Sequence, residues 1–202
     1  MSAILRQRTT LITSANMERE LLVEFKVLQN EALARLSAGA NRKGYLCQFR
    51  AIALPSFEDC RAYEILLPRG STDVRASNTV RAVAVRTVWR RSIDIEKFRD
   101  PVVRLKHGLA RLHPTIEETQ AGVQLEPVTK LLSKVGAVTV PAHIADYHVG
   151  VDGTSYELVL GGHFVVEARF KWWCNAPRGW EPLSALFGDI EALVENTLVA
   201  GS

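Results

Sequence analysis

The stretch Val149–Trp173, VGVDGTSYELVLGGHFVVEARFKWW, decides the fold that the sequence predicts. It holds two dipeptides, Asp152-Gly153 and Gly161-Gly162, each between residues of high strand propensity. Both favour two-residue hairpin turns, because they tolerate the positive φ angles that match the twist of paired strands. The stretch therefore predicts a three-stranded antiparallel meander, with strands over residues 146–151, 154–160 and 163–172.

Two-residue turns also fix which residues face each other across the meander. Leu160 would oppose His163, and Glu157 would lie between Val166 on one side and His148 on the other. The core face of the third strand would carry only apolar side chains: Phe164, Val166, Ala168, Phe170 and Trp172. We expect this face to pack beneath the final helix, since burial of each large side chain is worth about 1.5–3 kcal/mol.

The same register places His148 and Glu157 opposite each other on the apolar face. Ionisable groups are costly to bury without a partner, so such a pair would shift both pKa values. One hypothesis is a catalytic site in which His148 and Glu157 form a general acid–base couple in a pocket between sheet and helix. The alternative is that the first strand is an edge, with the pair at its solvated rim or displaced by a β-bulge. No nucleophile or oxyanion motif accompanies the pair, which favours the alternative.

Hydrophobic periodicity predicts the other elements of the chain. The first is an amphipathic helix over residues 16–37, whose apolar side chains recur every three or four residues. The later segments are 45–54, 61–67 and 79–91 (strands), 102–112 (helix after Pro101), 113–122 (loop with a helical turn), and 126–135 and 182–198 (helices). Together they predict an α+β fold: an antiparallel sheet of about six strands, with the N- and C-terminal helices packed on one face.

Length and composition limit the possible classes of protein. At 202 residues and 47% hydrophobic content, we expect a single domain over residues 1–202, with a possible subdivision near residues 112–125. No apolar run approaches the ~20 residues that span a bilayer, and no signal-type stretch follows Arg6 and Arg8. The three cysteines leave an odd thiol and form no CxxC motif. We therefore expect a cytoplasmic protein without a membrane partner.

Charge is divided along the chain. Residues 1–68 carry 9 basic and 7 acidic side chains, residues 69–111 carry 11 and 4, and residues 112–202 carry 5 and 11, which gives +2, +7 and −6. Such a division can mark a nucleic-acid surface, two halves that neutralise each other, or unlike faces in a homodimer. The lack of long Lys/Arg runs favours neutralisation. In the nucleic-acid alternative, Trp89 stacks on a base and basic residues of strand 81–91 contact phosphates: Arg81, Arg86, Arg90 and Arg91.

Motifs for cofactors and metals are missing from the sequence. It contains no GxGxxG, P-loop or GxSxG motif, and its histidines lack metal-ligand spacing. We therefore expect no cofactor and no metal. A different kind of site is suggested by Trp173 and Trp180, which could form an exposed aromatic patch of the sort found at protein interfaces. The alternative is that these tryptophans close one end of the core.

The tail of the chain resembles a known group of sequences. Three segments carry the likeness, DGTSYEL (152–158), ARFKWW (168–173) and APRGWEPL (176–183), followed by a hydrophobic helix. They are similar to scattered bacterial proteins of unassigned function, some of them immunity-protein-like. The likeness covers about a quarter of the chain and consists of a turn, a strand and a tryptophan-anchored helix. It implies an immunity or accessory type of protein and assigns no functional residue.

These observations favour a non-enzymatic cytosolic protein that binds another protein or a second copy of itself. The candidate binding residues are Trp173, Trp180, Arg86 and Arg90. One alternative is a small enzyme with the His148/Glu157 acid–base pair. The other is a nucleic-acid-binding module that uses the basic strand 81–91, and nucleic acid is the less favoured partner.

Overall fold

The computed structural model of the chain describes residues 21–40, 42–69, 82–100, 102–103, 112–141, 150, 152–161 and 167–201. Residues 21–38 are helical, and we call them the N-terminal helix. The elements that follow are β1 (Tyr45–Pro55), β2 (Cys60–Pro68), β3 (Ala82–Trp89), α2 (Arg91–Arg99), β4 (Ile116–Val123), α4 (Leu125–Ala137), β5 (Thr154–Gly161), β6 (Glu167–Trp173) and α5 (Glu181–Ala200). Within the described ranges, no helix has both the length and the apolar composition needed to cross a bilayer.

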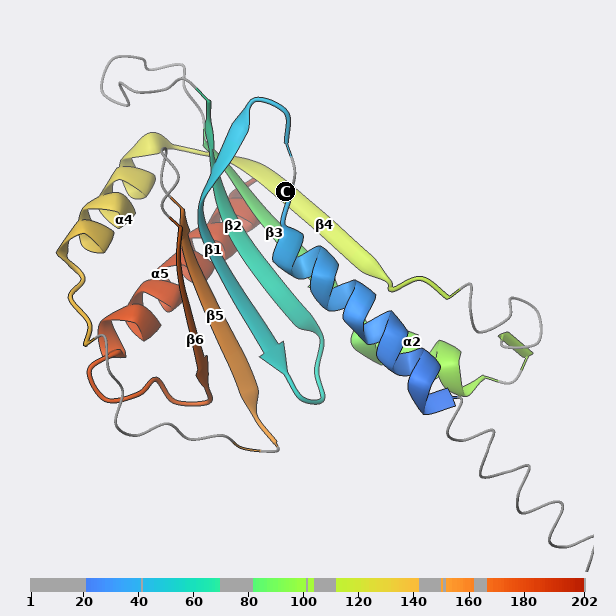
Figure 1. The fold of residues 1–202 in the computed structure, drawn as a ribbon. Helices are drawn as coiled ribbons and strands as arrows, with labels where there is room; N and C mark the ends of the chain where they lie inside the picture. Colours follow the sequence, from blue (N-terminus) through green and yellow to red (C-terminus); the bar gives the residue numbers. More distant parts are fainter. Residues whose placement is uncertain are drawn as a thin grey trace, which may run out of the picture.

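The six strands form one antiparallel sheet in the order β4-β3-β2-β1-β5-β6 (Figure 1). Strands β1 to β4 form a meander, since each pairs with the next along the chain. Strand β5 then returns to the free side of β1, and β6 continues outward from β5. As a result β1 lies inside the sheet, and β4 and β6 form its edges.

Helix α5 covers one face of the sheet and forms the larger core. It crosses the strands at an angle, behind the sheet in Figure 1. Its buried residues recur at helical spacing: Leu183, Leu186, Phe187, Ile190, Val194 and Leu198. Alternate residues of the strands meet this stripe, among them Phe49, Ala51, Tyr63, Ile65, Ala82, Ala84, Leu158 and Trp172. Helix α4 extends the same layer with Val128 and Leu131.

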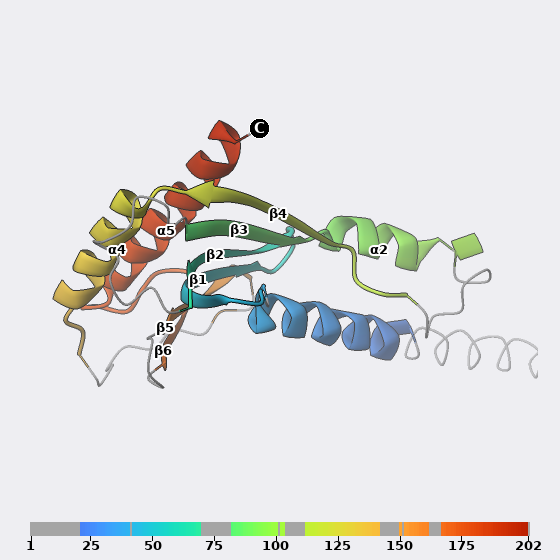
Figure 2. The same cartoon turned by 90° about the horizontal axis from the view of Figure 1, so that it is seen from above.

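The N-terminal helix packs on the opposite face of the sheet. Three of its residues are buried there: Leu28, Ala32 and Leu36. They belong to a second core with strand residues that point away from α5: Ile52, Cys60, Ala62 and Trp89. Neighbouring residues such as Ala51 and Ile52 therefore lie in different cores. Figure 2 shows the N-terminal helix and α5 on opposite sides of the sheet.

The predicted α+β class, the six antiparallel strands and the packing of both terminal helices on the sheet are confirmed. The two helices lie on opposite faces, however, and not on one face as predicted. The reason is that β1 and β2 are apolar on both faces, as fully buried strands are, so each face needs a cover.

The pairing of β5 with β6 differs from the predicted register. Gly161 pairs with Glu167, and Glu157 pairs with Lys171. A two-residue turn would have paired Glu157 with Val166, which lies five positions earlier than Lys171 in the chain. Side chains alternate between the two faces of a strand. A shift by an odd number of positions therefore turns the residues of one strand to the opposite face of the sheet relative to those of its partner strand.

The shifted register separates the apolar residues of the two strands from Glu157. Phe170 and Trp172 pack in the α5 core as predicted, together with Leu158 of β5. Glu157 points to the other face, because neighbouring residues of a strand alternate. Phe164, predicted to share this core, lies outside the described residues.

Strand β5 offers no pairing side to the predicted strand over residues 146–151. It pairs with β1 along its length on one side and with β6 on the other. Residues 146–149 and 151 lie outside the described part of the chain. The sixth strand is β4, in the segment 113–122 that was predicted as a loop. Its exposed polar sequence has little strand propensity, so pairing with β3 decides its conformation.

Helix α2 ends before Pro101, whereas the helix predicted for this region begins after it. The predicted span 102–112 lies mostly outside the described residues. A buried carboxylate fixes α2 in place, because Asp94 accepts hydrogen bonds from Trp89 Nε1 and from the Thr115 backbone N–H, both at 2.8 Å. This contact between the helix and the ends of two strands is tertiary and has no signature in the local sequence.

A buried ion pair joins the N-terminal helix to the sheet. Arg50 Nε donates to Glu64 Oε1 at 2.8 Å, and the Glu64 side chain is completely buried. Arg50 also donates to the carbonyl oxygens of Ser37 and Ala38 at the end of the helix. Glu64 Oε2 accepts the Ala40 N–H at 2.7 Å. The pair thus satisfies backbone groups that the helix terminus leaves without intrahelical partners.

Replacing Glu64 with Gln should lower the free energy of unfolding by about 3 kcal/mol, because Arg50 would be left buried without its counter-ion. Urea denaturation measures this change. The control is Glu126→Gln, since Glu126 and Lys130 form an exposed i,i+4 pair, which contributes less than about 0.5 kcal/mol. Equal losses in the two variants would show that the buried pair does not hold the helix to the sheet.

Candidate functional site

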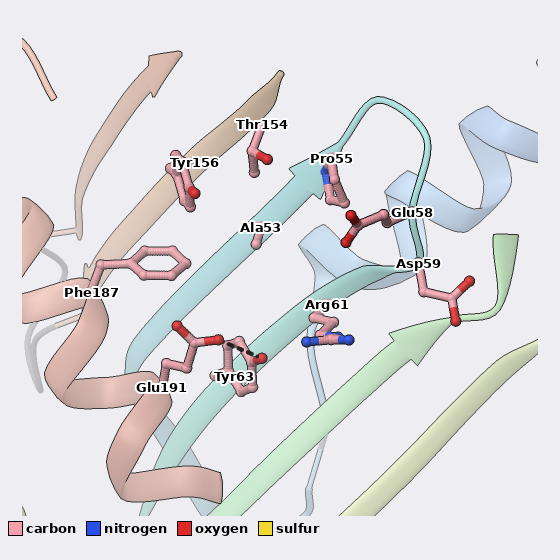
Figure 3. A pocket seen from close by; sticks show the side chains of 10 residues that line it. All are labelled: Ala53, Pro55, Glu58, Asp59, Arg61, Tyr63, Thr154, Tyr156, Phe187 and Glu191. Atoms are coloured by element: carbon pink, nitrogen blue, oxygen red, sulfur yellow. Dashed lines mark hydrogen bonds between the residues drawn. The ribbon is translucent and has the colours of Figure 1, made fainter. Parts of the chain in front are cut away.

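A hollow of about 170 Å³ opens between α5 and the end of the sheet that carries the β1–β2 turn. Strands β1, β2 and β5 and helix α5 surround it, as Figure 3 shows. The residues that line it are Ala53, Pro55, Glu58, Asp59, Arg61, Tyr63, Thr154, Tyr156, Phe187 and Glu191. We call it the Tyr63 hollow. Its strand residues lie on the face that α5 covers, because they alternate in step with the α5 core.

Tyr63 and Glu191 join the sheet to α5 within the hollow. The Tyr63 hydroxyl donates to Glu191 Oε1 at 2.8 Å (Figure 3). Burial raises the pKa of the Tyr63 phenol, and the bond to Glu191 raises it further. Tyr63 therefore stays protonated at neutral pH and acts as a donor that fixes the position of the carboxylate.

The turn between β1 and β2 supplies the acidic rim of the hollow. Its Ser56 donates a backbone hydrogen bond to the Gly153 carbonyl at 2.9 Å, which ties the turn to the start of β5. Asp59 accepts hydrogen bonds from Ser92 and pairs with Arg90 at 3.2 Å. Although burial acts to raise the pKa of Asp59, these hydrogen bonds outweigh it and lower that pKa. The Asp59 carboxylate is consequently charged at neutral pH.

The lining carries more acid than base. Three carboxylates, those of Glu58, Asp59 and Glu191, and one guanidinium, that of Arg61, line the hollow. Because Asp59 is paired with Arg90 outside the lining, the remaining formal charge of the lining is about −1. The interaction with Tyr63 raises the pKa of Arg61, and the acidic side chains of α5 contribute in the same direction. Glu191 and Glu195 therefore favour the charged form of Arg61.

Two aromatic rings complete the hollow. Tyr156 and Phe187 meet edge to face, with ring centroids 5.1 Å apart. Tyr156 also stacks on Trp172, at 5.6 Å and an interplanar angle of 19°. These contacts hold the Tyr156 ring in one orientation, because they connect it to the closely packed core.

Size and charge together indicate what the hollow can hold. It is smaller than the roughly 300–1,000 Å³ pockets that bind cofactors and drug-sized molecules. Carboxylates and the faces of aromatic rings both attract cations. The arrangement therefore suits a single guanidinium or ammonium group, such as the end of an arginine or lysine side chain.

The predicted acid–base pair is not part of the hollow. Glu157 lies on the opposite face of the sheet, almost fully buried, and pairs with Lys171 at 2.8 Å and Arg169 at 3.0 Å. Ile52 of β1 occupies the cross-strand position that the prediction gave to His148. His148 itself lies outside the described residues. Two cations thus balance Glu157, and its catalytic role stays a prediction.

Trp180 belongs to the core. It is 9% exposed, and its ring meets those of Phe170 and Trp172 edge-on, at centroid distances of 5.5 and 6.5 Å. Trp173 is half-buried, with its indole close to Gly153. The two side chains therefore do not form one exposed patch. Trp180 fits the alternative, in which it closes one end of the core.

Trp89 is also buried, which bears on the nucleic-acid alternative. The residue has no exposed surface, and its indole nitrogen is bonded to Asp94. Stacking on a base requires an accessible ring face. Trp89 cannot supply one in this fold.

Arg86 and Arg90 are both engaged in ion pairs. Arg86 pairs with Glu195 of α5 at 2.7 Å, and Arg90 pairs with Glu117 of β4 at 2.6 Å. Each pair joins the basic middle segment to the acidic C-terminal part of the chain, as mutual neutralisation predicts. Arg81 lies outside the described residues.

The structure also shows how the metal-ligating side chains are grouped and which cysteines are free. In the described ranges, no three His, Cys, Asp or Glu side chains are grouped to hold a metal ion. All three cysteines are free. Burial raises the pKa of Cys47 to about 12 and that of Cys60 to about 11, whereas Cys174 is exposed.

Sequence reasoning missed Tyr63, Arg61 and Glu191. Arg61 and Tyr63 alternate along a strand that was predicted correctly, and Glu191 follows Phe187 by one helical turn at the margin of the apolar stripe. Neither pattern links the strand to the helix. Tyr63 and Glu191 are 128 residues apart in the chain, so only the packing of α5 on the sheet brings them together.

Comparison of the chain with protein-family models, with curated proteins and with solved structures finds no match. The resemblance of residues 152–183 to bacterial proteins therefore stays a prediction. The geometry of the hollow is the basis for assigning it a role.

Alkylation by iodoacetamide at pH 8 should modify Cys174 in the folded protein and spare Cys47 and Cys60. The raised pKa leaves only about one thiolate in a thousand at Cys60 and fewer at Cys47, and the thiolate is the reactive form. Peptide mapping by mass spectrometry over time measures the three rates. In urea all three should react, and modification of folded Cys47 as fast as Cys174 would contradict its burial.

Proposed function

We propose that the protein acts by binding another protein, and that the Tyr63 hollow receives a lysine or arginine side chain of this partner. The observation that carries the proposal is the lining, in which three carboxylates, one guanidinium and three aromatic rings surround a space of side-chain size. The resemblance of the tail favours an immunity or accessory role in a bacterial cytoplasm, and we include that setting in the proposal.

A basic side chain would gain two interactions in the hollow. The carboxylate of Glu191 can accept a charge-assisted hydrogen bond through the oxygen that does not bind Tyr63. The Tyr156 ring can add a cation–π contact, worth about 0.5–2 kcal/mol. Both groups are already held by the core, so little side-chain freedom is lost when the partner binds.

The opposite assignment, an anion site built on Arg61, fits the lining less well. An anion would have to approach Glu58, Asp59 and Glu191, and like charges repel. The carboxylates of Glu191 and Glu195 also favour the charged form of Arg61 and would compete with an anion for it. The net charge therefore favours a cationic ligand.

N-acetyl-arginine amide should bind the hollow, whereas N-acetyl-citrulline amide, its uncharged isostere, should not. In an NMR titration, the arginine compound should shift the amide signals of Tyr63, Tyr156 and Glu191, and added salt should weaken the effect. Glu58→Gln/Glu191→Gln should weaken binding about thirtyfold, since each of the two charges at contact distance is worth about 1 kcal/mol in water. Glu126→Gln, which removes one carboxylate from α4 outside the hollow, is the control. Equal shifts with citrulline would contradict a cation site.

Affinity capture from a cell extract tests the protein-binding role itself. A partner should be retained by the wild-type protein and by Glu126→Gln, and lost from Glu58→Gln/Glu191→Gln. A partner retained equally by all three proteins would place the interface elsewhere on the surface. Failure of every variant to retain a protein would contradict the proposed function.

A further inference from the structure

We infer that the open edge of β4, together with a groove beside its C-terminal end, binds an extended segment of a partner protein by strand addition. The site is separate from the Tyr63 hollow and does not depend on its function. In the described part of the chain, β4 pairs only with β3 and ends the sheet. An edge strand of this kind presents backbone donors and acceptors that another strand can bind.

The phase of the β3–β4 ladder shows which groups are available. The Arg90 N–H donates to the Thr115 carbonyl at 2.9 Å, so this pair is a hydrogen-bonded one. In an antiparallel ladder such pairs recur at every second residue. The N–H and C=O groups of Glu118, Gln120 and Gly122 therefore point away from β3, toward the open edge.

A groove of about 350 Å³ lies at the C-terminal end of this edge. The last turn of α5 forms one of its walls, because α5 extends past β4 (Figure 2) and Gly201 packs against Ala121. The lining carries no charged side chain: Gly122, Val123, Gln124, Pro127, Leu193, Asn196, Thr197, Ala200 and Gly201. We call it the β4 groove. The Thr197 hydroxyl is bonded to the Leu193 carbonyl within α5, which leaves the walls mainly apolar.

The positions of the β4 side chains define the segment that fits. Val123 lies in the α5 core, so a residue added opposite Val123 points to the same side, into the β4 groove, and should be apolar. At the other end, Glu117 is paired with Arg90 and Glu118 with Arg42, and both carboxylates stay about half exposed, with side-chain exposures of 49% and 47%. An acidic residue opposite them would be repelled, whereas lysine or arginine would be attracted. The partner segment therefore combines an apolar first residue with basic residues five or six positions later, antiparallel to β4.

A second copy of the chain fits this edge less well. Suppose that two copies pair their β4 strands antiparallel, with Gln120 of one opposite Gln120 of the other. The face that α5 covers then lies on the same side of the joined sheet in both copies. In that register Glu117 of one copy lies opposite Val123 of the other and beside the uncharged β4 groove. Covering this edge would take the ion pair of Glu117 and Arg90 out of water, and the desolvation of both charges is costly.

The octapeptide Ac-VTVTTKKT-NH2 tests the inference, since its first valine falls opposite Val123 and its lysines opposite Glu118 and Glu117. At millimolar concentration it should slow hydrogen exchange of the Gln120 and Gly122 amides at least tenfold. Absence of this protection would overturn the inference. A peptide with aspartate in first position should bind at least tenfold more weakly, and equal binding would remove the apolar groove from the site.

Two variants and a matched control separate strand addition from other binding. Gln120→Pro removes a backbone donor at the open edge, where proline is tolerated, and should abolish protection at Gly122. Gln120→Ala keeps the donor and should bind as the wild type does. Ala200→Phe fills the groove and should weaken binding at least tenfold. Undiminished binding to Gln120→Pro would overturn strand addition.

Two further measurements distinguish this site from the other possibilities. Glu58→Gln/Glu191→Gln should bind the octapeptide normally, so loss of the Tyr63 hollow and loss of the β4 site can be told apart. Sedimentation should show no dimer that Gln120→Pro dissociates. A wild-type dimer that becomes monomeric in Gln120→Pro would replace the partner segment with a second copy of the chain.

Discussion

The alternation of side chains in β1 and β2 is the constraint on which the rest of the structure depends. Neighbouring apolar residues, such as Ala51 and Ile52, point to opposite faces and are both buried, so the centre of the sheet needs a cover on each side. Helices α4 and α5 cover one face, and the N-terminal helix covers the other. The ion pair of Arg50 and Glu64 then fixes the end of the N-terminal helix to the sheet. The two charges neutralise each other, and Arg50 also donates a hydrogen bond to a carbonyl group at the helix terminus.

Both candidate sites follow from the way α5 covers its face. A straight helix laid at an angle across a twisted sheet leaves parts of that face without cover. The Tyr63 hollow lies beside α5 near the β1–β2 turn, and the β4 groove lies under its C-terminal end. The two spaces differ in chemistry, since the first is rich in carboxylates and aromatic rings and the second has no charged side chain. They therefore suit different parts of a protein surface, a basic side chain and an extended backbone.

The local sequence pattern predicted the positions of most helices and strands, but it did not predict the candidate site. The apolar stripe of α5 and the largely apolar runs of β1, β2 and β3 can be read from the local sequence, so the positions of these elements could be predicted. Strand β4 could not, because its polar residues become a strand only through pairing with β3. The glycine pairs at the start and end of β5 suggested tight turns on both sides, but the observed pairing of Gly161 with Glu167 moves Glu157 to the other face. The pairing of β5 with β1 places Ile52 opposite Glu157, which removes the basis for a cross-strand partnership with His148.

The sequence by itself determined the α+β class, the apolar stripes of the terminal helices and the burial of Phe170 and Trp172, because hydrophobic periodicity is a local property. It also favoured mutual neutralisation of the basic and acidic segments, and Arg86 and Glu195 form one such pair. The tertiary structure decided the register of β5 with β6, the face chosen by each helix and the meeting of Tyr63 with Glu191. These features depend on contacts between residues far apart in the chain, whose energies are set by the packing of whole elements and not by the residues on either side.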